Sequence, residues 1–212
     1  MPCTLLSAGF FGRLSSELRE NELGPFDTAV ASAVARTRGD FDGPMLWLTR
    51  LGNGTSLLLI GASCGLLLLG LRRRRETAFL AAVGGGTFIL SVSLKLAFRR
   101  ARPGESVLYM IHSPRSFSFP SGHALASTAV LFGLVVVARV MGVHGVRLFV
   151  LSGVALVLVL GIASSRVYFG VHFPSDVLGG LLAGAAWVSA VTGWFYPRVL
   201  PGETAAASDP AR

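Results

Sequence analysis

The sequence is poor in charged residues and in cysteine. Only 14% of its 212 residues are charged, whereas 52% are hydrophobic. This balance indicates a membrane protein rather than an ordinary soluble domain. The two cysteines, Cys3 and Cys64, lie near the N-terminus and inside a long apolar run. A disulfide between them is therefore not expected, and they say nothing about the redox compartment.

Lysine is almost absent as well. The basic residues are 18 arginines and the single Lys95, and the chain carries a net charge of +8. A basic protein can bind nucleic acid, but these arginines flank apolar runs. Anionic membrane lipid is therefore the expected counterpart, and no nucleic acid is expected.

Five apolar runs are long enough to cross a bilayer. A hydrocarbon core about 30 Å thick requires about 20 mostly apolar helical residues. No run contains an interior charge and none alternates with a period of two, which argues against membrane-spanning strands. We expect an all-α fold, a multi-pass transmembrane helical bundle in the cell membrane. The five predicted spans are residues 51–71, 77–94, 123–138 extending towards Val143, 148–165 and 177–197.

The runs divide the chain into three segments. Residues 1–50 contain no predicted span and are expected to lie outside the cytoplasm or at the membrane interface. Within them, residues 26–34 place apolar side chains on one helical face, which predicts an amphipathic interfacial helix. Residues 51–197 form the membrane domain. Residues 198–212 are small and polar, and we expect a disordered tail.

The loop that contains Arg72 to Arg75 sets the orientation. Short basic loops remain in the cytoplasm. Threading the spans from this loop places the N-terminus and residues 95–122 and 165–176 on the outer side. Basic residues are then more numerous outside than inside. The predicted membrane orientation therefore depends on the arginine loop. It also requires that several of the outer basic residues have another role, such as binding a ligand.

Three polar clusters fall on this outer side, each at the end of a predicted span. Permanent cations and the backbone N–H groups of helix starts suit the oxygens of a phosphate. Lys95, Arg102 and Arg166 are therefore the candidate phosphate-binding side chains. The three clusters are Lys95 with Arg102, then Ser121 with Gly122 and His123, then Ser165 with Arg166, His172 and Asp176.

The second and third clusters coincide with expected helix starts. Ser121 is placed to cap the third span, and Gly122 lets the backbone come close to an anion, so both are candidate phosphate donors. Pro174 predicts that the last span begins near Ser175. His172 would then lie just before that helix, and Asp176 in its first turn.

The two histidines can take separate parts in phosphoryl transfer. A neutral His172, held in one tautomer by the Asp176 carboxylate, can attack phosphorus and become a phosphohistidine. His123 can protonate the departing oxygen and then activate the water that resolves the intermediate. This chemistry requires no metal and no cofactor.

Each of these residues also has a plainer interpretation. A single interfacial histidine is more often structural, and His112 and His144 are assigned to that category. An arginine beside a span usually reaches to lipid phosphates, an explanation that stays open for Arg99, Arg100 and Arg115. The joint occurrence of three clusters in order, on one predicted side, favours a phosphate site.

At these residues the sequence resembles the type 2 phosphatidic acid phosphatase family, which shares its site with vanadium haloperoxidases and some bacterial acid phosphatases. The family signature reads KxxxxxxRP, PSGH and SRxxxxxHxxxD. It occurs here at residues 95–103, 120–123 and 165–176. The resemblance implies a helical bundle whose site faces away from the cytoplasm. It also implies that Lys95, Arg102, Ser121, Gly122 and Arg166 bind phosphate and that His123, His172 and Asp176 are catalytic.

The resemblance also sets up a discrepancy in the number of spans. Membrane members of the family usually have six, and this sequence predicts five. Either the protein is a five-span variant with an external N-terminus, or a first span precedes Met1. The three motifs are unaffected in both cases.

The expected function is that of an integral membrane phosphatase for lipid phosphate monoesters or for lipid and isoprenoid pyrophosphates. The expected partners are that phosphorylated lipid and the membrane lipids, and the pattern specifies neither one lipid nor an oligomeric state. A non-catalytic protein that binds or moves a phosphorylated lipid is the alternative, although such a protein would be expected to lose His123 or His172. A haloperoxidase is disfavoured by the five spans. A transporter is disfavoured because the spans carry no ionisable group near the bilayer midplane.

Overall fold

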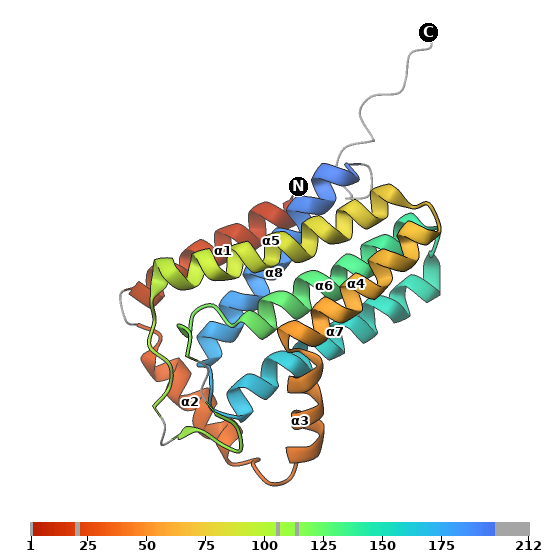
Figure 1. Ribbon diagram of the computed structural model, residues 1–212. Coiled ribbons are helices and arrows are strands. Elements are labelled where there is room, and N and C mark those ends of the chain that lie inside the picture. Colours follow the sequence, from red (N-terminus) through yellow and green to blue (C-terminus); the bar gives the residue numbers. More distant parts are fainter. Residues whose placement is uncertain (1, 20–21, 105–106, 113–114, 198–212) are drawn as a thin grey trace.

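The computed structural model describes residues 2–19, 22–104, 107–112 and 115–197. These residues form helices and connecting loops, with no strand among them, which confirms the predicted all-α fold (Figure 1). The predicted tail, residues 198–212, lies outside the described residues. The helices are α1 (Pro2–Arg19), α2 (Gly24–Ala35), α3 (Asp42–Leu51), α4 (Gly54–Gly70), α5 (Arg74–Phe98), α6 (Gly122–Val140), α7 (Gly145–Tyr168) and α8 (Pro174–Phe195).

Four of the described helices, α5 to α8, are each long and apolar enough to cross a membrane. Helices α3 and α4 pass the same test together, as a pair bent by 54°. The predicted first span is therefore bent near its start rather than straight. The bend falls at Gly52 and Asn53, because the Asn53 side chain accepts a hydrogen bond from the Ser56 N–H at 2.8 Å and starts a new helix. Each of the five predicted spans thus corresponds to a helix, or to the bent pair of helices, in the structure.

Helix α8 begins one residue before its predicted start, at Pro174. Proline suits the first helical turn because its missing N–H has no partner there in any case. The Asp176 side chain accepts the Phe173 N–H at 2.9 Å and so caps the helix. His172 precedes the helix and Asp176 lies in its first turn, as the sequence predicts.

Close packing between α6 and α8 forms the centre of the bundle. A Cβ atom on Gly180 would lie 2.5 Å from the Ser121 carbonyl oxygen, and one on Gly184 would lie 2.6 Å from that of Leu125. Only glycine permits the two backbones to approach this closely, as small residues do in membrane bundles. These contacts fix the start of α8 beside the start of α6.

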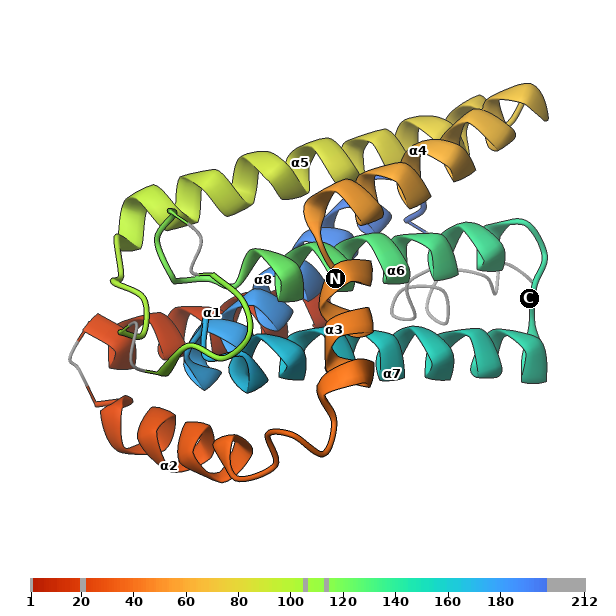
Figure 2. The same cartoon turned by 60° about the horizontal axis from the view of Figure 1, so that its bottom comes forward.

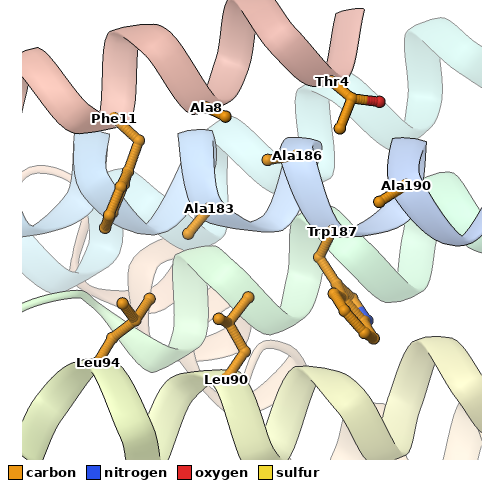
Figure 3. A pocket seen from close by; sticks show the side chains of 9 residues that line it. All are labelled: Thr4, Ala8, Phe11, Leu90, Leu94, Ala183, Ala186, Trp187 and Ala190. Atoms are coloured by element: carbon orange, nitrogen blue, oxygen red, sulfur yellow. The ribbon is translucent and has the colours of Figure 1, made fainter. Parts of the chain in front are cut away.

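Helix α1 occupies a region for which the sequence predicts no membrane-spanning helix. Its 18 residues, about 27 Å at 1.5 Å per residue, lie along α8 (Figures 1 and 2). The two helices are antiparallel, because Thr4 lies near Ala190 whereas Phe11 lies near Ala183 (Figure 3). Helix α1 thus reaches the end of the bundle at which α8 begins.

A helix is present over residues 26–34, as α2, but Phe26, Ala29 and Ala33 of the predicted apolar face are exposed. Helix α2 contacts α7 and α8 and lies near the start of α8 (Figure 2). Its Asp27 is buried although the rest of its surface is largely exposed or half-buried. A buried carboxylate needs partners, and those partners prove to belong to the site described next.

Candidate active site

One end of the bundle collects the three predicted polar clusters. Helices α5 and α7 end there, α6 and α8 begin there, and the loop between α5 and α6 folds over them (Figure 2). The arginine loop between α4 and α5 lies at the opposite end (Figure 2). The candidate site is therefore built from helix ends and loops at one face of a membrane bundle.

Lys95 and Arg102 meet at one backbone oxygen. The Phe117 carbonyl accepts a hydrogen bond from Lys95 Nζ at 2.5 Å and from Arg102 Nη2 at 3.4 Å. The Arg102 Nε atom also donates to the Ser116 carbonyl at 2.7 Å. The first cluster thus brings two cationic groups together and holds residues 116–117 beside them.

Arg102 also joins the first cluster to the third. Its Nη1 atom donates to the Val171 carbonyl at 2.7 Å and lies 3.1 Å from Nε2 of His172. A guanidinium can only donate, so Nε2 must accept and carries a lone pair. The proton of the neutral imidazole is then on Nδ1, which faces Asp176.

The other side of the His172 ring meets two oxygens. Its Nδ1 atom lies 3.4 Å from Asp176 Oδ2 and 3.4 Å from Ser118 Oγ. These separations are long for hydrogen bonds. The Ser118 hydroxyl itself donates to Asp176 Oδ2 at 2.5 Å. The structure therefore brings His172 and Asp176 together, with Ser118 as a third member of the group.

The surroundings of His172 keep its imidazole neutral. Burial lowers the pKa of His172 to about 4, and the positive charges of Arg102 and Arg166 act in the same direction, whereas Asp176 opposes them. Burial also lowers the pKa of Arg102, against the opposing charge of Asp176. A neutral imidazole is the form that can act as a nucleophile.

The second cluster lies against the first and third. A Cβ atom on Gly122 would lie 4.0 Å from the Lys95 side chain, and the Ser121 N–H donates to the Asp176 carbonyl at 2.9 Å. Ser121 occupies the predicted cap position of α6, but its hydroxyl makes no capping hydrogen bond. The prediction of a side-chain cap is therefore wrong, and the Ser121 N–H is already paired.

Arg166 and His123 are linked through Thr49 of α3. Arg166 Nη1 donates to the Thr49 hydroxyl, and the Thr49 backbone hydrogen-bonds His123. Arg166, Arg102 and His172 all lie close enough to His123 to interact electrostatically with its imidazole. His123 thus belongs to the same cluster, and α3 contributes a residue to the site that the sequence motifs do not include.

Two buried polar atoms of the site have no hydrogen-bond partner among the described residues: Ser121 Oγ and Arg166 Nε. Ser121 is fully buried and Arg166 is 4% exposed. An unpaired buried polar group costs about 1–3 kcal/mol, and both groups are free to donate a hydrogen bond to a bound anion. One hydroxyl and three nearby cations match an anion that offers several oxygen acceptors.

Arg100 is the main residue that the sequence interpretation misplaces. Its guanidinium donates to Asp176 Oδ1 at 2.5 Å and to Asp27 Oδ2 at 2.7 Å, so lipid phosphates do not explain it. Ser118, which bonds Asp176, is also absent from the predicted site. One sequence signal was available: Asp27 is an acidic residue within an otherwise apolar helical stretch and therefore requires a buried partner.

These observations define an all-helical, multi-span membrane protein that gathers three cations, two histidines and a carboxylate at one end of its bundle. Residues 75–200 match the PAP2 superfamily, and the chain belongs to that superfamily. The family resemblance of the three motifs is thereby confirmed.

Known relatives extend the match beyond those residues. The chain is 32% identical over 190 residues to phosphatidylglycerophosphatase B of Bacillus subtilis, covering 87% of this chain and 91% of that protein. It is 30% identical to undecaprenyl-diphosphatase of Sulfolobus acidocaldarius, covering 70% and 67% of the two chains. The crystal structure of a transmembrane PAP2-type phosphatidylglycerolphosphate phosphatase from Bacillus subtilis matches with a TM-score of 0.83 and 27% identity, over 92% of this chain and 96% of that one.

Proposed function

We propose that the protein is an integral membrane phosphatase that hydrolyses lipid phosphate monoesters or lipid and isoprenoid pyrophosphates through a phosphohistidine at His172. The observation that carries the proposal is the position of the His172 ring, whose Nε2 atom lies 3.1 Å from Arg102 Nη1 and whose Nδ1 atom lies 3.4 Å from Asp176 Oδ2. The named activities of the relatives, a phosphatidylglycerophosphatase and an undecaprenyl-diphosphatase, agree with this reaction class.

In the first step, Nε2 of His172 attacks phosphorus. The P–N bond forms as the bond from phosphorus to the lipid oxygen breaks, and His123 donates a proton to that departing oxygen. Asp176 stabilises the positive charge that develops on the imidazole. The cations of Lys95, Arg102 and Arg166 stabilise the oxygens of the transferring group, with the Ser121 hydroxyl and the Gly122 N–H as further donors.

In the second step, water releases the phosphate. His123, now neutral, takes a proton from the water, whose oxygen attacks phosphorus. The P–N bond breaks, and its electron pair returns to Nε2 of His172. Inorganic phosphate leaves in this step for either substrate. The two substrates differ in the group that leaves in the first step, which is the lipid alcohol from a monoester and the lipid monophosphate from a pyrophosphate. The charges are carried by side chains throughout, so no metal takes part in the proposed mechanism.

An apolar cavity beside the site supports a lipid substrate. It has a volume of about 290 Å³ and lies between α1, α5 and α8 (Figure 3). Leu94 lines it and directly precedes Lys95. Phe11 also lines it and stacks on Phe119, two residues before Ser121, with ring centroids 5.8 Å apart. A hydrocarbon chain attached to a phosphoryl group at the site would fit along this cavity towards Ala190.

The proposed site faces the outer side of the membrane. The loop with Arg72 to Arg75 lies at the opposite end of the bundle, and short arginine-rich loops stay in the cytoplasm (Figure 2). The substrate would then be presented from the outer leaflet.

The deciding experiment measures phosphate release by the purified protein from a panel of lipid phosphates and isoprenoid pyrophosphates. We expect turnover on at least one class, a loss of at least about a thousandfold in His172→Ala, and a phosphoenzyme in the wild type that acid destroys and alkali preserves. Wild-type turnover in His172→Ala would refute the mechanism. Tight lipid binding without turnover in either protein would instead support the non-catalytic alternative.

A further inference from the structure

Arg100 bridges two carboxylates that belong to different helices. Its Nη1 atom donates to Asp176 Oδ1 of α8 at 2.5 Å, and its Nη2 atom donates to Asp27 Oδ2 of α2 at 2.7 Å. The guanidinium also lies over the Phe173 ring, 4.3 Å from its centroid. The two carboxylate side chains are only 0% and 4% exposed, so both charges depend on Arg100 for compensation.

Asp27 holds the first turn of α8 in place. Its Oδ1 atom accepts the Ser175 N–H at 2.8 Å, and its Oδ2 atom accepts the Ser175 hydroxyl at 2.6 Å. The Ser175 hydroxyl in turn accepts from Arg100 Nη1 at 2.8 Å. Asp27 of α2 thus accepts a hydrogen bond from an N–H at the start of α8 that has no partner within that helix. The dipole of α8 also favours a negative charge at this end of the helix. Asp176 projects from the next residue.

The carboxylate of Asp176 is consequently held from both sides. Arg100 binds Oδ1, whereas the Ser118 hydroxyl and the Phe173 N–H bind Oδ2, the oxygen that faces His172. Loss of the Arg100 contact would let the carboxylate turn about its last bond. The His172 ring would then lose the group that fixes its tautomer.

We propose that Arg100 and Asp27 are positioning residues for the reaction, which act through Ser175 and Asp176 to hold the carboxylate that orients His172. The inference rests on the proposed function. Neither residue touches the phosphoryl group. Asp27 lies outside residues 75–200, so the α2 segment becomes part of the catalytic apparatus rather than a separate N-terminal element.

The charges of the pair also matter for the chemistry. Asp27 neutralises part of the Arg100 charge, so Asp176 keeps enough negative charge to stabilise the imidazolium that forms on His172. Removing Asp27 should therefore lower the pKa of His172 further, because the Arg100 charge is then uncompensated and Asp176 is held less firmly beside the ring. The other charged or titratable groups that act on His172 are Asp176, Arg102, Arg166 and His123, and substitution of Asp27 leaves them unchanged.

The kinetic test compares Arg100→Gln, Arg100→Lys and Asp27→Asn with the control Arg99→Gln. Arg99 is an exposed neighbour that donates to the Leu96 carbonyl, so its substitution removes the same charge without touching α2 or α8. We expect Arg100→Gln and Asp27→Asn to lower kcat about 10- to 100-fold with KM changed by less than about threefold, because the phosphate-binding cations remain. Arg100→Lys should recover part of the loss, and Arg99→Gln should retain wild-type kcat.

Two further measurements separate positioning from simple loss of structure. The double variant of Asp27→Asn with Arg100→Gln should be no slower than Arg100→Gln alone, since both act through one carboxylate. Titration of His172 by NMR should show a lower midpoint in Asp27→Asn than in the wild type. If Arg100→Gln does not fold, Asp27→Asn decides the matter, because asparagine keeps an oxygen for the Ser175 N–H.

Wild-type kcat in folded Arg100→Gln or Asp27→Asn would overturn the inference, as would additive losses in the double variant or an unchanged His172 midpoint in Asp27→Asn. The proposed function fails differently. In that case the wild type releases no phosphate, or His172→Ala is as active as the wild type. An active, His172-dependent enzyme whose Arg100 variants match the wild type would refute the positioning role alone.

Discussion

Nε2 of His172 lies 3.1 Å from Nη1 of Arg102, so the nitrogen that attacks in the proposed mechanism is the one that faces a cation proposed to bind phosphate. A phosphoryl oxygen held by that guanidinium brings phosphorus in front of the imidazole lone pair. Positioning of this kind supplies much of the rate of phosphoryl transfer, because little other covalent chemistry is needed.

The first prediction concerns the protonation of His172. Burial lowers its pKa to about 4, so the imidazole should stay neutral from pH 7 down to about pH 5 and lose its nucleophilic form only as the pH falls through about 4. NMR of protein labelled with ¹⁵N-histidine checks this, with His172→Ala to assign the resonance. A midpoint near the ordinary histidine value of about 6.5 would contradict it.

The second prediction concerns the unpaired hydroxyl of Ser121. Substitution Ser121→Ala should lower kcat/KM about 10- to 100-fold, since a hydrogen bond to a charged phosphoryl oxygen is lost. The thermal midpoint should not fall, because the hydroxyl has no partner among the described residues. Ser127→Ala is the control: this residue is equally buried in α6, but its hydroxyl donates to the Ala124 carbonyl at 3.3 Å. Parallel losses of activity and stability in Ser121→Ala would argue for a structural hydroxyl.

A third prediction concerns metal removal. Incubation with EDTA should leave phosphate release unchanged, because the proposed mechanism compensates every developing charge with a side chain. Vanadate should inhibit, since it adopts the five-coordinate geometry of phosphoryl transfer, and Arg166→Gln should weaken that inhibition. Loss of activity in EDTA that a divalent ion restores would require a different mechanism.

The spans could be predicted from sequence because the length and polarity of an apolar run are local properties. The bend between α3 and α4 could not, since it depends on the Asn53 side chain capping a new helix. Nor does the sequence predict that helix α1 joins the bundle, because its polar residues lower its hydropathy. It lies instead against the small side chains of α8, including Ala183 and Ala186, and these contacts depend on the tertiary structure (Figure 3).

The site shows the same division between local and tertiary information. The three motifs identify Lys95, Arg102 and His172, because each carries its chemistry in its residue type and spacing. From the sequence alone, contact with lipid phosphates is the simplest explanation for Arg100. The residues around an arginine beside a span do not show whether its side chain reaches to lipid or pairs inside the protein. Its partner Asp27 belongs to another helix, and only the fold brings them together.

The fourth prediction tests the face of the site. A cysteine introduced at Val107, which is 44% exposed in the loop over the site, should react with a membrane-impermeant maleimide in intact cells. A cysteine at Arg73, exposed in the arginine loop, should react only after permeabilisation. Both variants are made with Cys3 and Cys64 replaced by serine or alanine. The reverse pattern of labelling would turn the site towards the cytoplasm.

The last prediction tests whether the apolar cavity holds the hydrocarbon chain of a lipid substrate. Ala186 lies in its wall between α1 and α8, so Ala186→Phe should fill part of the space that a hydrocarbon chain needs (Figure 3). We expect kcat/KM to fall about tenfold or more for long-chain lipid phosphates and to stay within about twofold for a short, water-soluble phosphate ester. Ala185→Phe changes the neighbouring residue, which is not part of the cavity wall, and should not discriminate by chain length. If Ala186→Phe instead lowers both rates equally, the cavity does not hold the chain, because a defect in the phosphate site affects every substrate alike.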